Sequence, residues 1–209
     1  MSQLAADGEL KEITDAVSPC LEMTEISRRV LERQGPALLF RNPSGYDMPV
    51  LTNLFGSVSR IVRAMGGETV QDLRRTGQFL ASLKEPERPE KLSEIVGMGA
   101  MLKSVLDMRP KERKDAACHD IILEGNDVDM GRLPVQTCWP EDAGPLITWG
   151  LVVTRGPGKK RQNLGVYRQQ VIGANKVIMR WLPHRGGAQD FREYRMVNKG
   201  RPFPVAVVI

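Results

Sequence analysis

The sequence has little of what several classes of protein depend on. Its three cysteines, Cys20, Cys118 and Cys138, are odd in number and far apart, unlike a disulfide framework or a zinc site, so we interpret them as reduced thiols. No apolar run approaches the roughly 18 residues that a membrane helix needs. The first residues lack the basic and apolar regions of a secretory signal. We therefore expect a cytoplasmic protein.

The sequence also lacks the motifs of several common catalytic sites. Its two histidines, His119 and His184, belong neither to an HExxH pattern nor to a cluster of histidines and cysteines. No serine has the surroundings of a nucleophile elbow. The basic, glycine-containing segment 155–161 does not follow the GxxxxGKS/T pattern, and we interpret it as a solvated hairpin tip. These absences argue against a zinc protease, an α/β-hydrolase and a P-loop nucleotide-binding protein.

Charge is distributed unevenly along an otherwise ordinary composition. The 209 residues, 41% hydrophobic and 26% charged, are typical of one or two globular domains. Residues 151–209 hold 12 lysines and arginines against Asp190 and Glu193 and carry +10, whereas residues 1–150 hold 18 bases and 23 acids and carry −5.

Two interpretations of this asymmetry stay open. The basic segment could bind an anionic partner such as a nucleic acid, a membrane surface or a phosphorylated cofactor, or it could only offset the acidic half. It has few aromatic residues on which bases could stack and no helix-turn-helix or RNP pattern, so we expect no nucleic-acid partner.

The first part of the chain reads as a mixture of strands and helices without a catalytic motif. Apolar periodicity and turn residues predict helices at 21–34, 58–65 (capped by Ser57), 69–83 and 92–106, strands at 37–40 and 49–54, and a polar linker at 85–90. The sequence therefore favours a packing or assembly unit here.

The second part is richer in strands. It predicts strands at 121–123, 146–154, 163–172 and 176–182, a hairpin loop at 173–175, a helix at 188–197 and a buried strand at 203–209. No turn or polar tail follows the last strand, so we expect the chain to be the front part of a longer protein.

The expected hairpin bears on a possible anion site. With the loop at 173–175, Arg168 lies opposite Arg180, a repulsive pair that a phosphate between the two guanidinium groups would reverse. A two-residue loop would place Arg168 opposite Trp181 instead. Both arginines could also simply extend into solvent. Asn163 and Arg168 fall on opposite faces of a regular strand unless Gly165 introduces a bulge.

Three segments carry a resemblance to a known family: residues 147–157 (ITWGLVVTRGP), 161–170 (RQNLGVYRQQ) and 179–187 (MRWLPHRGG). Together they closely resemble the UbiD family of decarboxylases, most of all the branch that acts on 3-polyprenyl-4-hydroxybenzoate in ubiquinone biosynthesis. The resemblance implies an α+β fold, with an N-terminal α/β domain at 1–118. The first part of a split β-barrel domain of the FMN-binding type would follow at 119–209.

The resemblance also implies cofactors and partners. Family members use prenylated FMN, supplied by a flavin prenyltransferase, with a divalent metal, commonly manganese, and often potassium. The modified flavin serves as an electron sink so that CO2 can leave an aromatic or unsaturated acid. For the full-length protein the resemblance implies a homo-oligomer, and a polyprenyl substrate suggests peripheral contact with the inner face of the membrane.

The family's functional residues map onto specific positions. Asn163 and His184 resemble metal ligands, and Arg168 resembles the catalytic arginine that orients the substrate carboxylate. The flavin-lining segments correspond to Val166, Tyr167, Arg168, Arg180, Trp181, Leu182, Arg185 and Gly186.

The family's acidic residues, a metal ligand and two network glutamates, fall beyond position 209. We therefore expect this chain to be inactive alone. A non-catalytic flavin-binding or assembly module derived from the family is the alternative, and an ordinary FMN oxidoreductase with a similar barrel is another.

Overall fold

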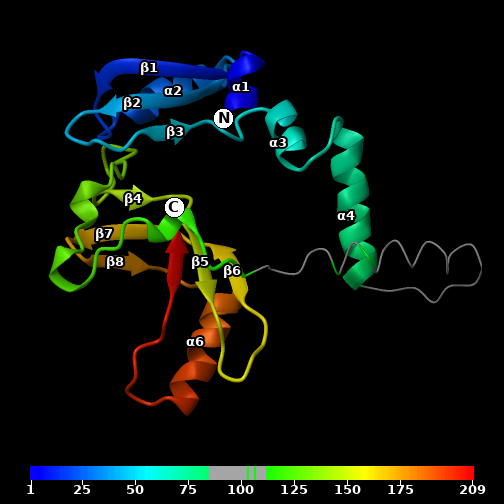
Figure 1. Cartoon of the computed structure of the whole chain (residues 1–209), viewed down its shortest axis with the longest axis vertical. Coiled ribbons are helices and arrows are strands. Elements are labelled where there is room, and N and C mark those ends of the chain that lie inside the picture. Colours follow the sequence, from blue (N-terminus) through cyan, green and yellow to red (C-terminus); the bar gives the residue numbers. More distant parts are fainter. Residues whose placement is uncertain (85–102, 104–105, 107–111) are drawn as a thin grey trace, which may run out of the picture. The chain divides into compact units, whose positions relative to one another are not determined.

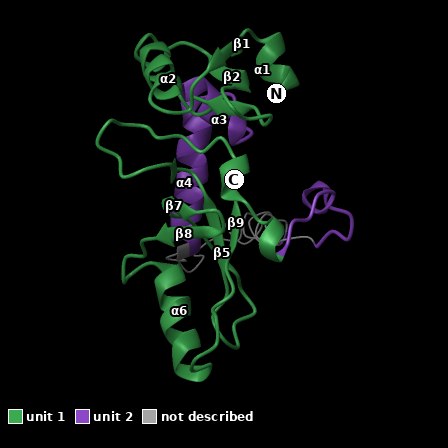
Figure 2. Ribbon diagram, turned by 90° about the vertical axis from the view of Figure 1, so that its left-hand side faces the viewer, with its two compact units in different colours: residues 1–56, 125–209 green, residues 57–124 purple. Residues whose placement is uncertain are grey.

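The chain folds into two compact units in the computed structural model, which describes residues 1–84, 103, 106 and 112–209 (Figures 1 and 2). Residues 1–56 and 125–209 form the first unit, and residues 57–124 form the second. The fold is α+β, as the sequence predicts. Among the described residues, no helix combines the length and apolar character that crossing a membrane requires.

The first unit begins with a small sheet. After helix α1 (Ser2–Ala6), strand β1 (Leu10–Val17) pairs in parallel with β2 (Ala37–Pro43), which pairs antiparallel with β3 (Val50–Thr52). Helix α2 (Glu22–Glu32) connects the two parallel strands, as parallel pairing demands. The helix expected at 21–34 and the strands expected at 37–40 and 49–54 are confirmed.

Strand β1 is absent from the sequence-based expectations, and its apolar pattern explains why. Its large apolar residues, Leu10, Ile13 and Val17, are spaced by three and four positions, as in a helix. The pairing with β2 shifts register between Ile13 and Ala16, so the alternation typical of strands is interrupted.

The core of this part lies between α2 and the sheet. Phe40 and Met23 are fully buried, and Leu38 and Val17 are nearly so. Met23 and the half-buried Ile26 and Val30 of α2 lie on one helical face.

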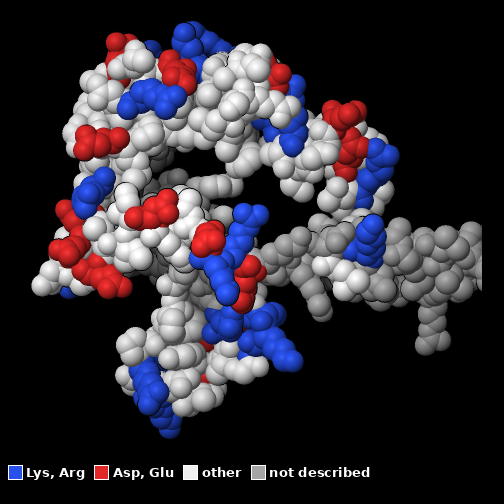
Figure 3. All heavy atoms as spheres, viewed as in Figure 1, with Lys and Arg blue, Asp and Glu red and all other residues white. Residues whose placement is uncertain are grey.

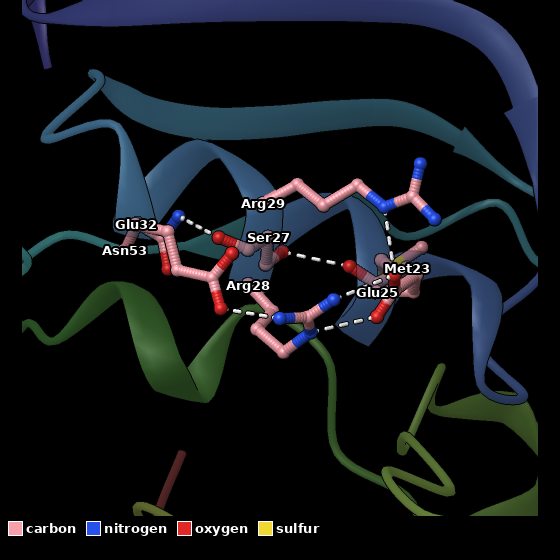
Figure 4. A network of polar contacts seen from close by, with 7 residues as sticks. All are labelled: Met23, Glu25, Ser27, Arg28, Arg29, Glu32 and Asn53. Carbon is pink, nitrogen blue, oxygen red and sulfur yellow. Dashed lines mark hydrogen bonds and ion pairs between the residues drawn. The ribbon is translucent and has the colours of Figure 1, made fainter.

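Polar contacts fasten α2 to the end of β3 (Figure 4). The Ser27 hydroxyl donates to the Met23 carbonyl (2.7 Å) and shares a 2.8 Å hydrogen bond with the Thr52 hydroxyl. Asn53 Nδ2 donates to the Ser27 carbonyl at 2.7 Å. The helix and strand are thus linked through groups that would otherwise be buried without partners.

The outer face of α2 carries an ion-pair network, also drawn in Figure 4. Glu25 accepts hydrogen bonds from Arg28 (2.8 Å) and Arg29 (2.7 Å), and Arg28 also pairs with Glu32. The hydrogen bonds from Arg28 and then Arg29 lower the pKa of Glu25 to about 2.

The second unit contains helices α3 (Val58–Ala64) and α4 (Val70–Lys84). Ser57 Oγ caps α3 by accepting from the Arg60 amide at 3.3 Å, as expected. The helices predicted at 58–65 and 69–83 are confirmed, whereas the linker at 85–90 and the helix at 92–106 lie outside the described residues apart from two isolated positions.

The prediction of a strand at 121–123 is wrong. These residues have no regular structure, and Ile121 is 79% exposed. A short 3-10 turn, Ala117–His119, precedes them, and no described strand pairs with the segment. An apolar run forms a strand only where a neighbour can satisfy its backbone groups.

The rest of the first unit follows two 3-10 turns, Gly125–Asp127 and Met130–Arg132, and holds two three-stranded sheets. One consists of β4 (Leu146–Ile147), β7 (Gln169–Gly173) and β8 (Lys176–Met179). The other consists of β6 (Asn163–Val166), β5 (Leu151–Thr154) and β9 (Ala206–Val208), and helix α6 (Gly186–Val197) packs against β5 and β6. The described residues form no closed barrel.

Two strands expected to be continuous are each divided between these sheets. The run 146–154 breaks before Leu151, and the run 163–172 breaks at Tyr167 and Arg168. Gly165 pairs regularly with Val152, so it does not form the bulge that was one possibility, and the change of direction comes two residues later. Periodicity could not reveal this break because the residues on both sides favour strands.

The last strand is exposed rather than buried. The three residues of β9 pair antiparallel with β5, from Leu151–Val208 to Val153–Ala206, but their side chains face solvent in this structure. The predicted strand is present, and its predicted burial is wrong here.

Replacement of Phe40 with alanine is expected to lower the free energy of unfolding of the first unit by about 3–5 kcal/mol, because it leaves a cavity in a fully buried core. Urea unfolding followed by circular dichroism measures this change. Phe55→Ala is the matched control, because Phe55 is 45% exposed and should cost less than half as much. Equal losses would show that Phe40 is not central to the core.

Candidate functional site

A cavity of about 560 Å³ lies where the chain passes from β6 into β7. Its volume is within the usual range for small-molecule and cofactor sites. It is lined by Gly165, Val166, Tyr167, Arg168, Arg180, Leu182 and Arg185. The structure therefore brings together all of the expected flavin-contacting positions except Trp181 and Gly186.

Three arginines make this cavity electropositive. Arg168, Arg180 and Arg185 are exposed, and within the described parts of the chain none has a carboxylate in ion-pair contact. Guanidinium groups that share a cavity repel one another unless an anion lies between them, and each can bind phosphate or carboxylate oxygens in pairs. The lining thus favours a ligand with several anionic oxygens.

The hairpin register bears on the pairing expected for two of these arginines. Gln169 pairs with Met179, Gln170 with Ile178 and Val171 with Val177, which is the register of the three-residue loop. A shift near the loop pairs Gly173, rather than Ile172, with Lys176. The last pair of the ladder is Gln169–Met179, directly next to Arg168 and Arg180. These two arginines are therefore not paired within the sheet, and both line the cavity. The alternative register, with Arg168 opposite Trp181, is wrong.

Tyr167 ties the cavity wall to α6. Its side chain is buried, and its hydroxyl accepts a hydrogen bond from the Gly187 amide at 3.2 Å. Its ring lies 6.1 Å from that of Trp181, which in turn contacts Phe191 and Phe203. Trp181 therefore supports Tyr167 from an aromatic cluster and does not line the cavity itself.

Gln169 holds the break between β6 and β7, a role for which no pattern in the sequence is a signal. Its side chain is 1% exposed, and its Nε2 donates to the Tyr167 carbonyl at 2.6 Å. A Cβ at Gly150 would approach the Gln169 amide to 2.8 Å, so the glycine provides the space that the side chain fills. Together they fix the corner that places Tyr167 and Arg168 at the cavity.

The two expected metal ligands both lie near the start of α6. Asn163 Nδ2 donates to Thr154 Oγ1 at 3.2 Å, and a Cβ at Gly186 would lie 2.1 Å from Asn163 Oδ1. His184 is exposed in the turn before α6, and its carbonyl accepts from Gln189 Nε2. In the described ranges, no three His, Cys, Asp or Glu side chains cluster as a metal site. An amide oxygen and an imidazole do suit a divalent cation that also binds a phosphate.

A buried carboxylate organises the loop between β5 and β6. Asp190 of α6 is fully buried and accepts hydrogen bonds from Thr154 Oγ1 and Lys159 Nζ, both at 2.9 Å. Arg161 lies 3.7 Å away, and Glu193 pairs with Lys159 at 2.6 Å. Basic side chains gather around this loop and α6 in Figure 3. The segment interpreted as a solvated tip is therefore anchored through Lys159.

The surroundings of Asp190 act on its pKa in opposite directions. Burial, the largest influence, raises it, because a charged carboxylate is poorly solvated there. Hydrogen bonds from Lys159 and Thr154, with the charges of Lys159 and Arg161, outweigh burial and leave the pKa below its ordinary value. Asp190 is thus ionised at neutral pH and acts only as an acceptor.

Two models of one protein family match this chain. The N-terminal domain of 3-octaprenyl-4-hydroxybenzoate carboxy-lyase matches residues 1–80, and the Rift-related domain of the same enzyme matches residues 109–209. The chain therefore has the consecutive domains of a UbiD-class carboxy-lyase. It belongs to the UbiD family.

Solved structures of a UbiD-class enzyme have a similar fold. The UbiD-class enzyme HmfF from Pelotomaculum thermopropionicum, in complex with FMN, matches all of this chain with a TM-score of 0.76 and 25% identity, over 41% of its own length. An evolved dimeric form of HmfF with prFMN gives a TM-score of 0.77 at 25% identity, over 42% of its length.

A third structure supports the fold alone. Vanillic acid decarboxylase from Sedimentibacter hydroxybenzoicus, in its closed form, is 22% identical and matches the whole chain with a TM-score of 0.76, over 41% of its length. The chain thus spans about two fifths of the length of the structures it matches.

Replacement of Asp190 with asparagine is expected to change how stability depends on pH. Because the folded-state pKa is lowered, the stabilisation by Asp190 is complete above the unfolded pKa of about 3.9 and is lost as pH falls through the folded-state pKa. Asp190→Asn should lower the free energy of unfolding at pH 7 by about 1–3 kcal/mol and flatten its decline below about pH 4.

Urea unfolding between pH 2.5 and 7 measures this effect. Glu193→Gln is the control, because Glu193 also pairs with Lys159 but is only half-buried. If the free energy of unfolding of Asp190→Asn declined at acid pH as steeply as that of the wild-type chain, the assigned role of the carboxylate would be contradicted.

Proposed function

We propose that this chain is the N-terminal part of a non-oxidative, prenylated-FMN-dependent decarboxylase, and that its arginine-lined cavity contributes to the flavin site. The observation that carries the proposal is that three arginines line one cavity in a UbiD-family chain and that none of them has a carboxylate partner among the residues that the structure describes. The FMN and prFMN complexes of HmfF support the choice of cofactor.

The cavity suits the two ends of such a cofactor. Arg180 and Arg185 would bind the phosphate through paired hydrogen bonds, while Val166 and Leu182 offer apolar contact to a ring system. When bound, prenylated FMN supplies an electron sink into which the electrons of the breaking carbon–carbon bond can move.

Arg168 is the proposed catalytic residue of this chain. It would hold the substrate carboxylate by a charged hydrogen bond and so orient it before CO2 leaves. Tyr167 and Gln169 fix the backbone from which the Arg168 side chain extends.

The proposed metal ligands of this chain are Asn163 and His184, which would hold a divalent cation, manganese by preference. Potassium is a further proposed cofactor. Amide oxygens are ligands that hard cations accept, and the Asn163 Oδ1 has no hydrogen-bond donor among the described residues.

The proposed substrate is 3-polyprenyl-4-hydroxybenzoate or a related aromatic acid, in ubiquinone biosynthesis. The matching family model, named for 3-octaprenyl-4-hydroxybenzoate, supports this choice. A flavin prenyltransferase would supply the cofactor, the full-length protein would form a homo-oligomer, and a lipid-tailed substrate suggests a cytoplasmic protein that contacts the inner face of the membrane.

Arg180→Ala is expected to weaken FMN binding by about 10- to 100-fold, because it removes charged hydrogen bonds to the phosphate. Quenching of flavin fluorescence during titration of the chain measures the affinity. Lys176→Ala is the control, because it removes the same charge from the start of β8, the strand that Arg180 directly follows, and Lys176 does not line the cavity. Equal losses in both variants would indicate general charge attraction instead of a site.

The chain alone, given prenylated FMN, Mn²⁺ and substrate, is expected to bind flavin and release no CO2. The proposal rests on the two-fifths share of the matched structures that the chain spans. Release of CO2 measured by gas chromatography would contradict it. Flavin binding without CO2 release by a longer native protein that contains this chain would favour a non-catalytic flavin-binding or assembly module.

A further inference from the structure

A chain of hydrogen bonds runs from the interior face of α6 to the side chain of Asn163. Asp190 Oδ1 accepts from Lys159 Nζ and Asp190 Oδ2 accepts from Thr154 Oγ1, each at 2.9 Å. Thr154 Oγ1 in turn accepts from Asn163 Nδ2 at 3.2 Å. Both oxygens of the buried carboxylate are therefore occupied.

The donors and acceptors in this chain allow only one direction. The Thr154 hydroxyl has a single hydrogen, and the carboxylate of Asp190 can only accept, so that hydrogen points to Asp190. The hydroxyl oxygen must then accept from Asn163, and only the NH2 group of the amide can donate. The amide oxygen of Asn163 is consequently turned away from Thr154.

Helix α6 leaves room for the amide oxygen of Asn163. Gly186 lies one helical turn before Asp190, so both residues lie on one face of α6. A Cβ at position 186 would lie 2.1 Å from Asn163 Oδ1. Any residue larger than glycine would therefore displace this oxygen. No hydrogen-bond donor reaches this oxygen from the parts of the chain that the structure describes.

We infer that Asp190 and Thr154 are positioning residues that fix the Asn163 amide so that it presents its oxygen, and not its NH2 group, to a divalent cation. The inference rests on the proposed function for the cation itself. It assigns a role to two residues that do not line the cavity, and it gives a reason for the burial of a carboxylate next to the basic loop between β5 and β6.

Asp190→Asn should invert the chain of hydrogen bonds. Lys159 would still donate to the one oxygen that the asparagine side chain retains, so the new NH2 group would face Thr154. The Thr154 hydroxyl would accept from it and donate to Asn163, whose oxygen would turn inward and whose NH2 group would face the cation site.

Side-chain amide NMR on the ¹⁵N-labelled chain tests the orientation without any cofactor. The Asn163 NH2 signals are assigned by their loss in Asn163→Ala. Wild-type signals should show one proton protected from exchange with water, and protection should fall at least about tenfold in Asp190→Asn and Thr154→Val. Thr154→Ser keeps the hydroxyl and should restore protection to within about twofold of wild type.

Mn²⁺ binding in the presence of FMN, followed by electron paramagnetic resonance, tests the consequence. Because orienting partners of a ligand usually change metal affinity by about 10- to 100-fold, Asp190→Asn and Thr154→Val should weaken binding by that factor. Thr154→Ser and Glu193→Gln should stay within about twofold, since Glu193 touches Lys159 but not Thr154. Thermal unfolding checks that each variant is folded.

The two readouts separate the inference from the proposed function. Unchanged NH2 protection in folded Thr154→Val would overturn the inference. Altered protection with unaltered Mn²⁺ affinity would also overturn it, because the amide would then not serve a cation. If the wild-type chain binds no Mn²⁺, the proposed metal fails, and the claim about amide orientation still stands or falls on the exchange data.

Discussion

The buried carboxylate of Asp190 is the interaction on which the second part of this structure depends. Removing a carboxylate from water is costly, so it persists only where donors replace the lost solvent. Here Thr154 and Lys159 both donate to it, one from β5 and one from the following loop. A single side chain of α6 therefore fixes the helix, the end of a strand and the course of the loop, and through Thr154 it reaches Asn163.

The cavity exists because the chain changes sheets between β6 and β7. A continuous strand would have put Asn163 and Arg168 on opposite faces, but the break at Tyr167 gives the residues after it a new direction. Gln169, buried against Gly150, and the contact of Tyr167 with α6 hold this corner. The lining residues thus lie at or next to strand ends, on a corner whose backbone is held by buried contacts, which is the kind of support that a binding site needs.

The excess positive charge of residues 151–209 has two distinct roles. Lys159 and Arg161 lie against Asp190, and Lys159 also pairs with Glu193, so this part of the charge is neutralised within the fold. The arginines of the cavity lining have no such partners among the described residues. The charge near Asp190 is therefore balanced inside the basic segment itself and not by the acidic half, whereas the cavity arginines carry the excess on which the proposed anion binding rests.

The sequence by itself determined the family, the fold class and most of the residues that line the cavity, whereas it left two hairpin registers open, between which the structure decided. Helix periodicity, turn residues and family motifs are local properties that persist outside the folded state. Only the tertiary structure decided where 163–172 breaks, that 121–123 forms no strand, and that Trp181 packs behind the cavity. It alone brought Asp190 to Thr154, 36 positions away. Pairing partners and burial depend on residues distant in sequence, which local patterns do not encode.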